Sequence, residues 1–261
     1  MRFPFQSTTE EKAVRLPLPS PRPVLKTGSV AASYALARMA GDFCDLQEAG
    51  EPRLVLILLT DIAGRRGDAL NVAAVVQERY RARIPELFGR PDLNQADAIT
   101  ELLIEINRAL LEAAGGVRCT PAFLACYEEG LGTLTYINAG HEPGLLRDGT
   151  SVTLLESHGP PLGLFSHATY DAQYSVLAPG AALLLGSRGL MEARNGSKEF
   201  GVERLKETLL ARPFSDAAEL CGVVLEAVRV YVRGNPPQDD MTALALVRAP
   251  LAYFAAAHSL L

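Results

Sequence analysis

Acidic residues stand at the ends of two apolar segments that lie far apart in the chain. Asp61 follows the apolar run 54–59, and the pair Asp239 and Asp240 precedes the apolar run 242–247. Short carboxylates fixed at the ends of buried strands suit a hard divalent cation, because Mg²⁺ and Mn²⁺ prefer oxygen ligands and the turns admit water. The pattern therefore predicts a metal centre built from two distant loops.

Further acids stand near glycine in the same part of the chain. Asp42 and Asp45 occur in the segment Ala-Gly-Asp-Phe-Cys-Asp, and Asp68 precedes a helical pattern. Taken singly, each is explained as a solvated turn acid or a helix cap, and Asp68 in particular fits a cap. The matching places of Asp61 and Asp239 at the ends of buried runs favour a shared site over separate turns.

A third turn carries a cation where an acid would fit. Gly186-Ser187-Arg188-Gly189 follows the apolar run 181–185, as Asp61 follows its own run. Arg188 therefore decides whether this site is inactive or altered.

Apolar periodicity predicts the elements that hold these turns. The uninterrupted runs 54–59 and 181–185 suit strands that are covered on both faces. Glycine-bearing turns predict two hairpins in the middle of the chain. The predicted helices span 68–84, 94 or 97 to 114, 203–210 and 216–232, and the hairpins span 123–137 and 145–155. This order predicts an α+β fold, a four-layer α/β/β/α sandwich, rather than a doubly wound parallel sheet.

Composition limits the classes of function. The chain has 261 residues, 48% of them hydrophobic, and a net charge of −5 without a basic cluster, which argues against nucleic-acid binding. No apolar stretch approaches the ~20 residues of a membrane helix, and no signal-peptide core stands at the N-terminus, so we expect no membrane partner and a cytoplasmic location. The four cysteines lack Cys-x-x-Cys spacing and are expected to be free thiols.

Five short segments stand in order along the chain: Gly-Asp-Phe-Cys-Asp (41–45), Asp-Ile-Ala-Gly (61–64), Asn-Ala-Gly-His-Glu-Pro (138–143), Phe-Gly-Val-Glu-Arg-Leu (200–205) and Pro-Gln-Asp-Asp-Met-Thr (237–242). They resemble the motifs Gly-Gly-Asp-Phe-Tyr-Asp, Asp-Val-Ser-Gly, Asn-Ala-Gly-His-x-Pro, Phe-Gly-x-Glu-Arg-Leu and Gln-Asp-Asp-x-Thr. These motifs belong to the SpoIIE/RsbU-like branch of the PPM metal-dependent serine/threonine phosphatases. Each motif alone is weak, but the order and spacing agree over most of the chain.

The resemblance implies a PPM-type β-sandwich with two Mn²⁺ or Mg²⁺ ions at one end. It implies that Asp61 bridges both ions with help from the Ile62 carbonyl, that Asp239 and Asp240 complete the metal set, and that Asp42 holds metal-bound water. Two such ions lower the pKa of a shared water and aim it at phosphorus. The implied substrate is a phosphorylated protein, in this family typically an anti-sigma-factor antagonist of bacterial partner-switching signalling.

This sequence departs from the family at the metal set. Arg188 stands where the family has a metal-binding aspartate, which exchanges −1 for +1 beside a divalent ion. Two unit charges ~5 Å apart in an effective dielectric of ~20 interact by about 3 kcal/mol. The exchange therefore removes an attraction to the divalent ion and adds a repulsion. Arg65 and Arg66 add positive charge, unless both are solvated loop residues. We therefore expect metal occupancy to fall to one ion or none.

Two functions remain open at this point, and the retention of Asp42, Asp61 and Asp239 favours the first. In the first, the chain is an active phosphoserine/phosphothreonine phosphatase in which Arg188, with Arg65, binds the substrate phosphate bidentately while one metal supplies water. In the second, it is a catalytically impaired pseudophosphatase that binds a protein partner. His141 is either a general acid or, as we favour, a turn residue that bonds to backbone.

The predicted domain limits follow from composition. Residues 1–24 form an irregular proline-rich arm, 25–248 the phosphatase-type domain and 249–261 an apolar tail. The tail is apolar enough to pack on a partner subunit, which suggests a homodimer or an accessory-subunit role.

Overall fold

The structure is a computed structural model that describes residues 17–18, 20–35, 41–50, 52–62, 66–114, 119–233, 235 and 239–250. Most of the predicted arm 1–24 and of the predicted tail 249–261 lies outside these residues. No helix within the described ranges is long and apolar enough to cross a membrane.

Two five-stranded antiparallel sheets form the centre of the molecule. The first sheet has the strand order β1 (Gly28–Ala35), β12 (Met241–Arg248), β9 (Ala182–Gly186), β6 (Gly144–Asp148) and β7 (Ser151–Leu155). The second sheet has the strand order β2 (Asp42–Ala49), β3 (Leu54–Asp61), β4 (Ala122–Glu128), β5 (Thr133–Ala139) and β8 (Gln173–Val176).

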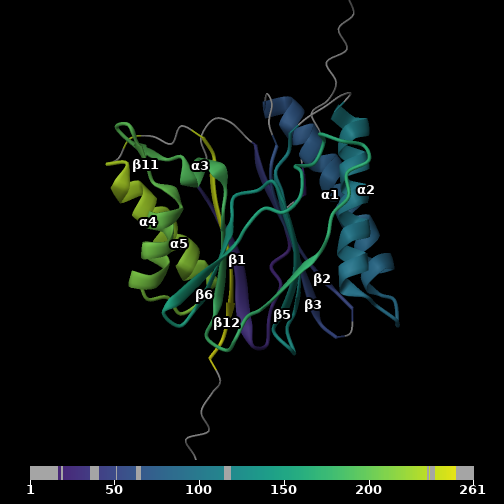
Figure 1. The fold of residues 1–261 in the computed structure, drawn as a ribbon, viewed down its shortest axis with the longest axis horizontal. Helices are drawn as coiled ribbons and strands as arrows, with labels where there is room; N and C mark the ends of the chain where they lie inside the picture. Colours follow the sequence, from purple (N-terminus) through teal and green to yellow (C-terminus); the bar gives the residue numbers. More distant parts are fainter. Residues whose placement is uncertain are drawn as a thin grey trace, which may run out of the picture.

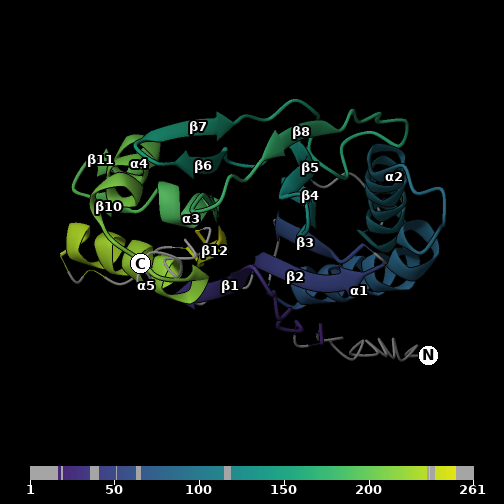
Figure 2. The same ribbon diagram turned by 90° about the horizontal axis from the view of Figure 1, so that it is seen from below.

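Helices cover the outer face of each sheet. Helices α1 (Arg66–Phe88) and α2 (Gln95–Ala114) pack on the second sheet, whereas α4 (Gly201–Ala211) and α5 (Ala217–Tyr231) pack on the first, as Figures 1 and 2 show. A one-turn helix, α3 (Arg188–Met191), and a small hairpin, β10 (Arg194–Asn195) with β11 (Lys198–Glu199), lie beside the first sheet. The predicted four-layer α/β/β/α sandwich is therefore confirmed.

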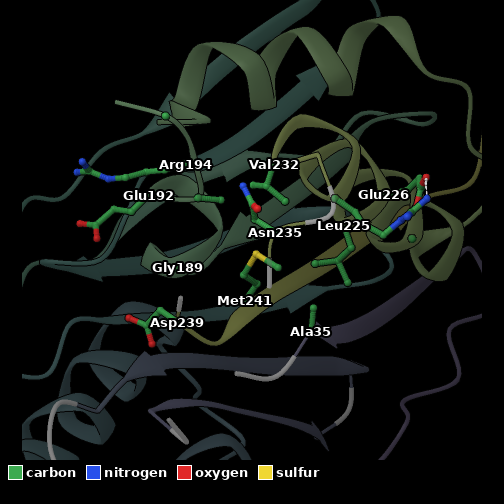
Figure 3. A pocket seen from close by; sticks show the side chains of 14 residues that line it. Ala35, Gly189, Glu192, Arg194, Leu225, Glu226, Val232, Asn235, Asp239 and Met241 are labelled. Carbon is green, nitrogen blue, oxygen red and sulfur yellow. Dashed lines mark hydrogen bonds and ion pairs between the residues drawn. The ribbon is translucent and has the colours of Figure 1, made fainter. Parts of the chain in front are cut away.

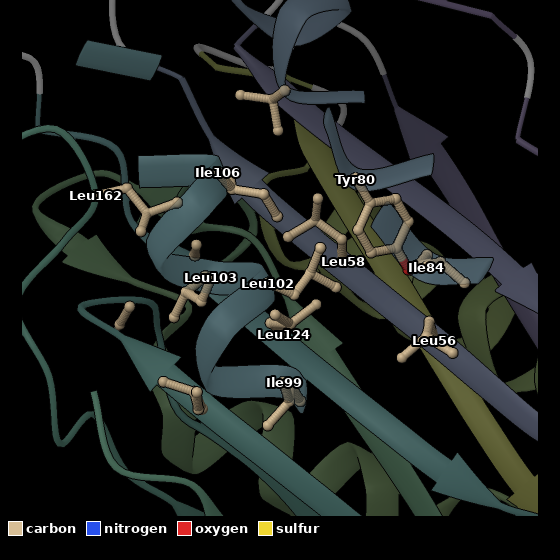
Figure 4. Close-up of a cluster of buried hydrophobic side chains, with 14 of the residues drawn as sticks. Leu56, Leu58, Tyr80, Ile84, Ile99, Leu102, Leu103, Ile106, Leu124 and Leu162 are labelled. Atoms are coloured by element: carbon tan, nitrogen blue, oxygen red, sulfur yellow. The ribbon is translucent and has the colours of Figure 1, made fainter. Parts of the chain in front are cut away.

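Strand β3 shows why the apolar runs form the middle of this sandwich. Its side chains point alternately to opposite faces of the sheet. Leu54, Leu56 and Leu58 pack under α1 and α2, while Ile57 and Leu59 pack between the two sheets. Figure 4 shows Leu56 and Leu58 among the helix side chains. A strand that is buried on both faces needs an uninterrupted apolar sequence, and 54–59 has one.

Strand β2 was missed because its polar residues resemble a turn. The sequence suggests turns at Asp42 and Asp45, but Asp42 is the first residue of β2 and Asp45 lies inside the strand. Asp45 is fully buried, and Arg81 of α1 offsets the charge with two hydrogen bonds, from Nε to Oδ2 (2.7 Å) and from Nη2 to Oδ1 (3.1 Å). The ion pair therefore fixes α1 on the edge strand of its sheet.

Helix α1 also differs at both ends from its predicted range. It begins at Arg66, so Asp68 lies in its first turn instead of capping it. A carboxylate in the first turn still interacts favourably with the helix dipole. The helix continues through Pro85 to Phe88.

Removing the partner of Asp45 should destabilise the whole sandwich. We expect Arg81→Met to lower the free energy of unfolding by about 3 kcal/mol, because it leaves a buried carboxylate without its counter-ion. Urea denaturation measures the loss. Arg79→Met is the matched control, since Arg79 is exposed and its Glu105 partner is 3.7 Å away; a loss of the same size there would contradict the assigned role of the buried pair.

Candidate functional site

The candidate site lies where the two sheets meet at one end of the sandwich. Antiparallel pairing of β2 with β3 places Asp42 opposite Asp61. In the other sheet, Asp239 and Asp240 directly precede β12. Two hydrogen bonds join the sheets here, from the Gly41 amide to Asp240 Oδ2 (3.1 Å) and from Thr242 Oγ1 to Asp42 Oδ2 (2.6 Å). The structure thus brings four predicted site aspartates into one cluster.

Helix α3 is held against this cluster by close backbone contact. The Ser187 amide donates to the Thr242 carbonyl (3.0 Å), and Ser187 Oγ accepts from the Thr242 amide (2.9 Å). A Cβ on Gly189 would stand 2.1 Å from the Asp240 carbonyl oxygen, so only glycine fits there. The glycine therefore lets α3 approach the aspartates closely, with Arg188 directed at them.

Arg188 connects the acids of the two sheets. Its Nε donates to Asp61 Oδ2 at 2.9 Å and its Nη2 donates to Asp239 Oδ2 at 3.3 Å. Its Nη1 lies 3.8 Å from Glu192 Oε2, one turn along. The Arg188 side chain is 46% exposed, whereas that of Asp61 is 13% exposed. One guanidinium thus balances two carboxylates that would otherwise repel each other.

The charges at the site shift two pKa values in the directions that this geometry predicts. The hydrogen bond to Asp61 raises the pKa of Arg188, so its charge is permanent. Burial raises the pKa of Asp42 to about 7; hydrogen bonds from Ser187 and Thr242 oppose the rise, and Asp61 and Asp240 add to it. Asp42 is therefore a carboxyl group that holds its proton up to near neutral pH.

The described conformation does not fit a pair of divalent ions. Within the described ranges no group of three or more Asp, Glu, His or Cys side chains is arranged to hold a metal ion. Asp61 and Asp239 direct Oδ2 at Arg188, and Asp240 and Asp42 accept from Gly41 and Thr242. The carboxylates would suit a hard cation, but one oxygen of each already accepts a hydrogen bond from a protein donor.

The other predicted site residues are placed as follows. Ile62 is buried, and its amide donates to the Gly41 carbonyl (2.8 Å). Arg65 lies outside the described residues, as does the side chain of Arg66.

His141 is almost fully buried and bonds through Nδ1 to the Glu142 carbonyl (3.0 Å), which agrees with the favoured turn role. Burial lowers its pKa; the hydrogen bond to Glu142 opposes this, as does the charge of Asp61.

Sequence reasoning missed two contributors to this site. The hydroxyl of Thr242 fixes Asp42, and Glu192 adds a third acid near Arg188. Thr242 ends the Gln-Asp-Asp-x-Thr segment and Glu192 stands four residues after Arg188, so both were visible beside residues that the sequence analysis singled out.

Comparisons with known proteins agree with this fold. The family model of stage II sporulation protein E (SpoIIE) matches residues 38–249. Protein IcfG of Synechocystis is 34% identical over 119 residues, which are 45% of this chain and 19% of that protein. The chain thus spans about a fifth of this curated relative.

Solved structures add fold matches. The RsbU and RsbW domains of Rv1364c from Mycobacterium tuberculosis match with a TM-score of 0.69 and 24% identity, covering 87% of this chain and 63% of that one. The SiaA-PP2C domain of Pseudomonas aeruginosa matches with a TM-score of 0.70 and 19% identity, covering 84% and 85%. The catalytic domain of serine/threonine protein phosphatase PstP, solved with two manganese ions, matches with a TM-score of 0.60 and 14% identity, covering 84% of this chain and 98% of that one. At these identities the matches establish the fold.

The raised pKa of Asp42 predicts a pH-dependent stability. Between its ordinary value of 3.8 and about 7, the folded state holds a proton that the unfolded state has lost, so the free energy of unfolding should fall as pH rises through this window. Urea denaturation at a series of pH values measures the fall, and Asp42→Asn should flatten it. Asp148→Asn, which alters an exposed turn acid, is the control; an unchanged pH slope in Asp42→Asn would contradict the assignment.

Proposed function

We propose that this chain, which belongs to the SpoIIE family and has the PPM serine/threonine phosphatase fold, is a phosphoprotein-directed phosphatase domain with a degenerate metal centre. In the described state Arg188 takes the place of the divalent cations. The domain then acts as a catalytically impaired, regulatory protein-binding module.

The ion pairs of Arg188 with Asp61 and Asp239 carry this proposal. The resemblance assigns both aspartates to the metal set, yet each directs an oxygen at the guanidinium instead. A divalent ion would have to displace a permanent charge that is bound to both of its own ligands. Divalent-cation binding should therefore be weak in the native chain.

Without a divalent cation the site also disfavours a phosphate group. Among the side chains that the structure describes at the cluster, the charges of Asp61, Asp239, Asp240 and Glu192 outnumber that of Arg188. A phosphoryl group would meet net negative charge from these side chains, and Arg188 would have to leave its carboxylate partners to bind it. This supports recognition of a partner through surfaces beside the cluster over hydrolysis at the cluster.

A second candidate function is the active phosphatase with one ion, Mn²⁺ or Mg²⁺. The retention of Asp42, Asp61, Asp239 and Asp240 in one cluster favours it, as does the exposure of Arg188. In that state Asp61, Asp239 and Asp240, with the Ile62 carbonyl, would hold the ion, and the ion would activate water.

For either function we propose a protein partner of the kind that phosphatases of this family recognise. A phosphorylated protein, such as an anti-sigma-factor antagonist in a partner-switching pathway, is the expected class. The match to the structure of the RsbU and RsbW domains of Rv1364c supports this choice. We also propose that the protein is cytoplasmic. The homodimer stays a prediction from the sequence.

Reversing the charge at position 188 tests the proposal. We expect the native chain to release almost no phosphate from p-nitrophenyl phosphate across a Mn²⁺ titration. Arg188→Asp should bind Mn²⁺ at least about a hundredfold more tightly than the native chain, because the change removes a repulsion and adds a ligand. Calorimetry measures the affinity and absorbance measures the turnover. Arg229→Asp, an equal charge change at an exposed residue away from the aspartates, should gain neither.

Two outcomes would decide against this proposal. Mn²⁺-dependent turnover by the native chain that disappears in Asp61→Asn would establish the active phosphatase instead. Equal Mn²⁺ affinity in the native chain and in Arg188→Asp would contradict the electrostatic role of Arg188.

A further inference from the structure

A cavity of about 760 Å³ opens beside the aspartate cluster. It lies between α5, α3 and the β10–β11 hairpin, and Figure 3 shows Asp239 at one end and Glu226 at the other. Asp239 belongs to both the cavity and the cluster, and Gly189, which packs against Asp240, also lines the cavity. We call this cavity the α5 groove, and its volume is in the range of ~300–1,000 Å³ that is typical of ligand sites.

The floor of the α5 groove is apolar and its rim charges are paired. Leu225, Val232 and Met241 supply side chains to the lining, as Figure 3 shows. On the rim, Arg229 donates to Glu226 through Nε (2.6 Å) and Nη2 (2.7 Å), and Arg194 is paired with Glu199. Because Arg194 and Arg229 each have an acidic partner and the floor is apolar, the groove favours an uncharged, apolar occupant.

Gly222 lines the α5 groove without contributing a side chain. It is exposed in the middle of α5, where glycine costs about 1 kcal/mol relative to alanine. A Cβ there would meet no atom within 4 Å, so packing inside the described part of the fold does not require a glycine. On its other side the same residue borders a second cavity of about 370 Å³, next to the exposed Val230. The surface of α5 is therefore unobstructed at Gly222, so another polypeptide chain could cross the helix there in close contact.

We infer that the α5 groove binds an apolar segment of a partner protein, whose backbone crosses α5 at Gly222 and whose aliphatic side chains cover Leu225 and Met241. The inference rests on the proposed function, since it names the surface by which a silenced domain holds its partner. Continuity with the cluster, an apolar floor, paired rim charges and an open helix wall together favour a peptide chain over a compact anion.

Four fluorescein-labelled peptides test the inference on the full chain. Each carries a central serine, phosphorylated or not, flanked by glutamine alternating with leucine or with serine. We expect the leucine peptides to bind at least about tenfold more tightly than their serine counterparts, because burial of even one leucine is worth more than this factor. Gly222→Met, which fills the wall, should reduce the affinity for leucine peptides to that for serine peptides in fluorescence anisotropy.

Matched variants separate a filled groove from a damaged fold. Ala218→Met places the same side chain at an exposed position of α5 outside the groove and should bind the leucine peptides like the native chain. Gly222→Ala should raise the melting temperature, which shows that α5 accepts a side chain there. Equal binding by Gly222→Met and Ala218→Met, or no preference for leucine, would overturn the inference.

The same experiment keeps this inference separate from the proposed function. Release of phosphate from the phosphorylated peptides by the native chain would overturn the silenced site, whereas the leucine preference and its loss in Gly222→Met would still support the groove. If the folded native chain releases no phosphate and binds leucine and serine peptides with equal affinity, only the inference about the α5 groove is overturned.

Discussion

The rest of the site depends on two ion pairs that Arg188 forms, one with Asp61 and one with Asp239. Without a cation between them, these carboxylates from different sheets would repel each other across the end of the sandwich. One guanidinium, 2.9 Å from one acid and 3.3 Å from the other, removes this repulsion. In the described conformation this guanidinium is therefore the positive charge that balances both carboxylates.

The sandwich explains how such a contact arises. Pairing of β2 with β3 presents Asp42 and Asp61 from one sheet, and the start of β12 presents Asp239 and Asp240 from the other. Gly189 allows α3 to lie directly on the second pair. Leu190 and Met191 of α3 also pack into the core beneath the first sheet, so the backbone position of Arg188 is fixed by core packing as well as by the contacts at the site.

The elements that sequence could predict are those whose burial leaves a simple apolar pattern. Strands β3, β9 and β12 are buried on both faces, and α2 and α5 have clear apolar stripes, so runs and periodicity found them. Strand β2 could not be found in this way, because Asp45 is buried with a counter-ion from α1 that stands 36 positions later. Likewise, the identity of Arg188 is visible in the sequence, but its two carboxylate partners depend on loop geometry. The α5 groove left no signal in the pattern, because its walls come from three separate elements.

Diffraction from crystals of the native chain soaked in Mn²⁺, recorded near the manganese absorption edge, tests the central claim most directly. The account predicts no anomalous peak between Asp61 and Asp239, with the guanidinium of Arg188 bound to both carboxylates. Two strong peaks beside Asp61, with Arg188 turned away into solvent, would contradict it.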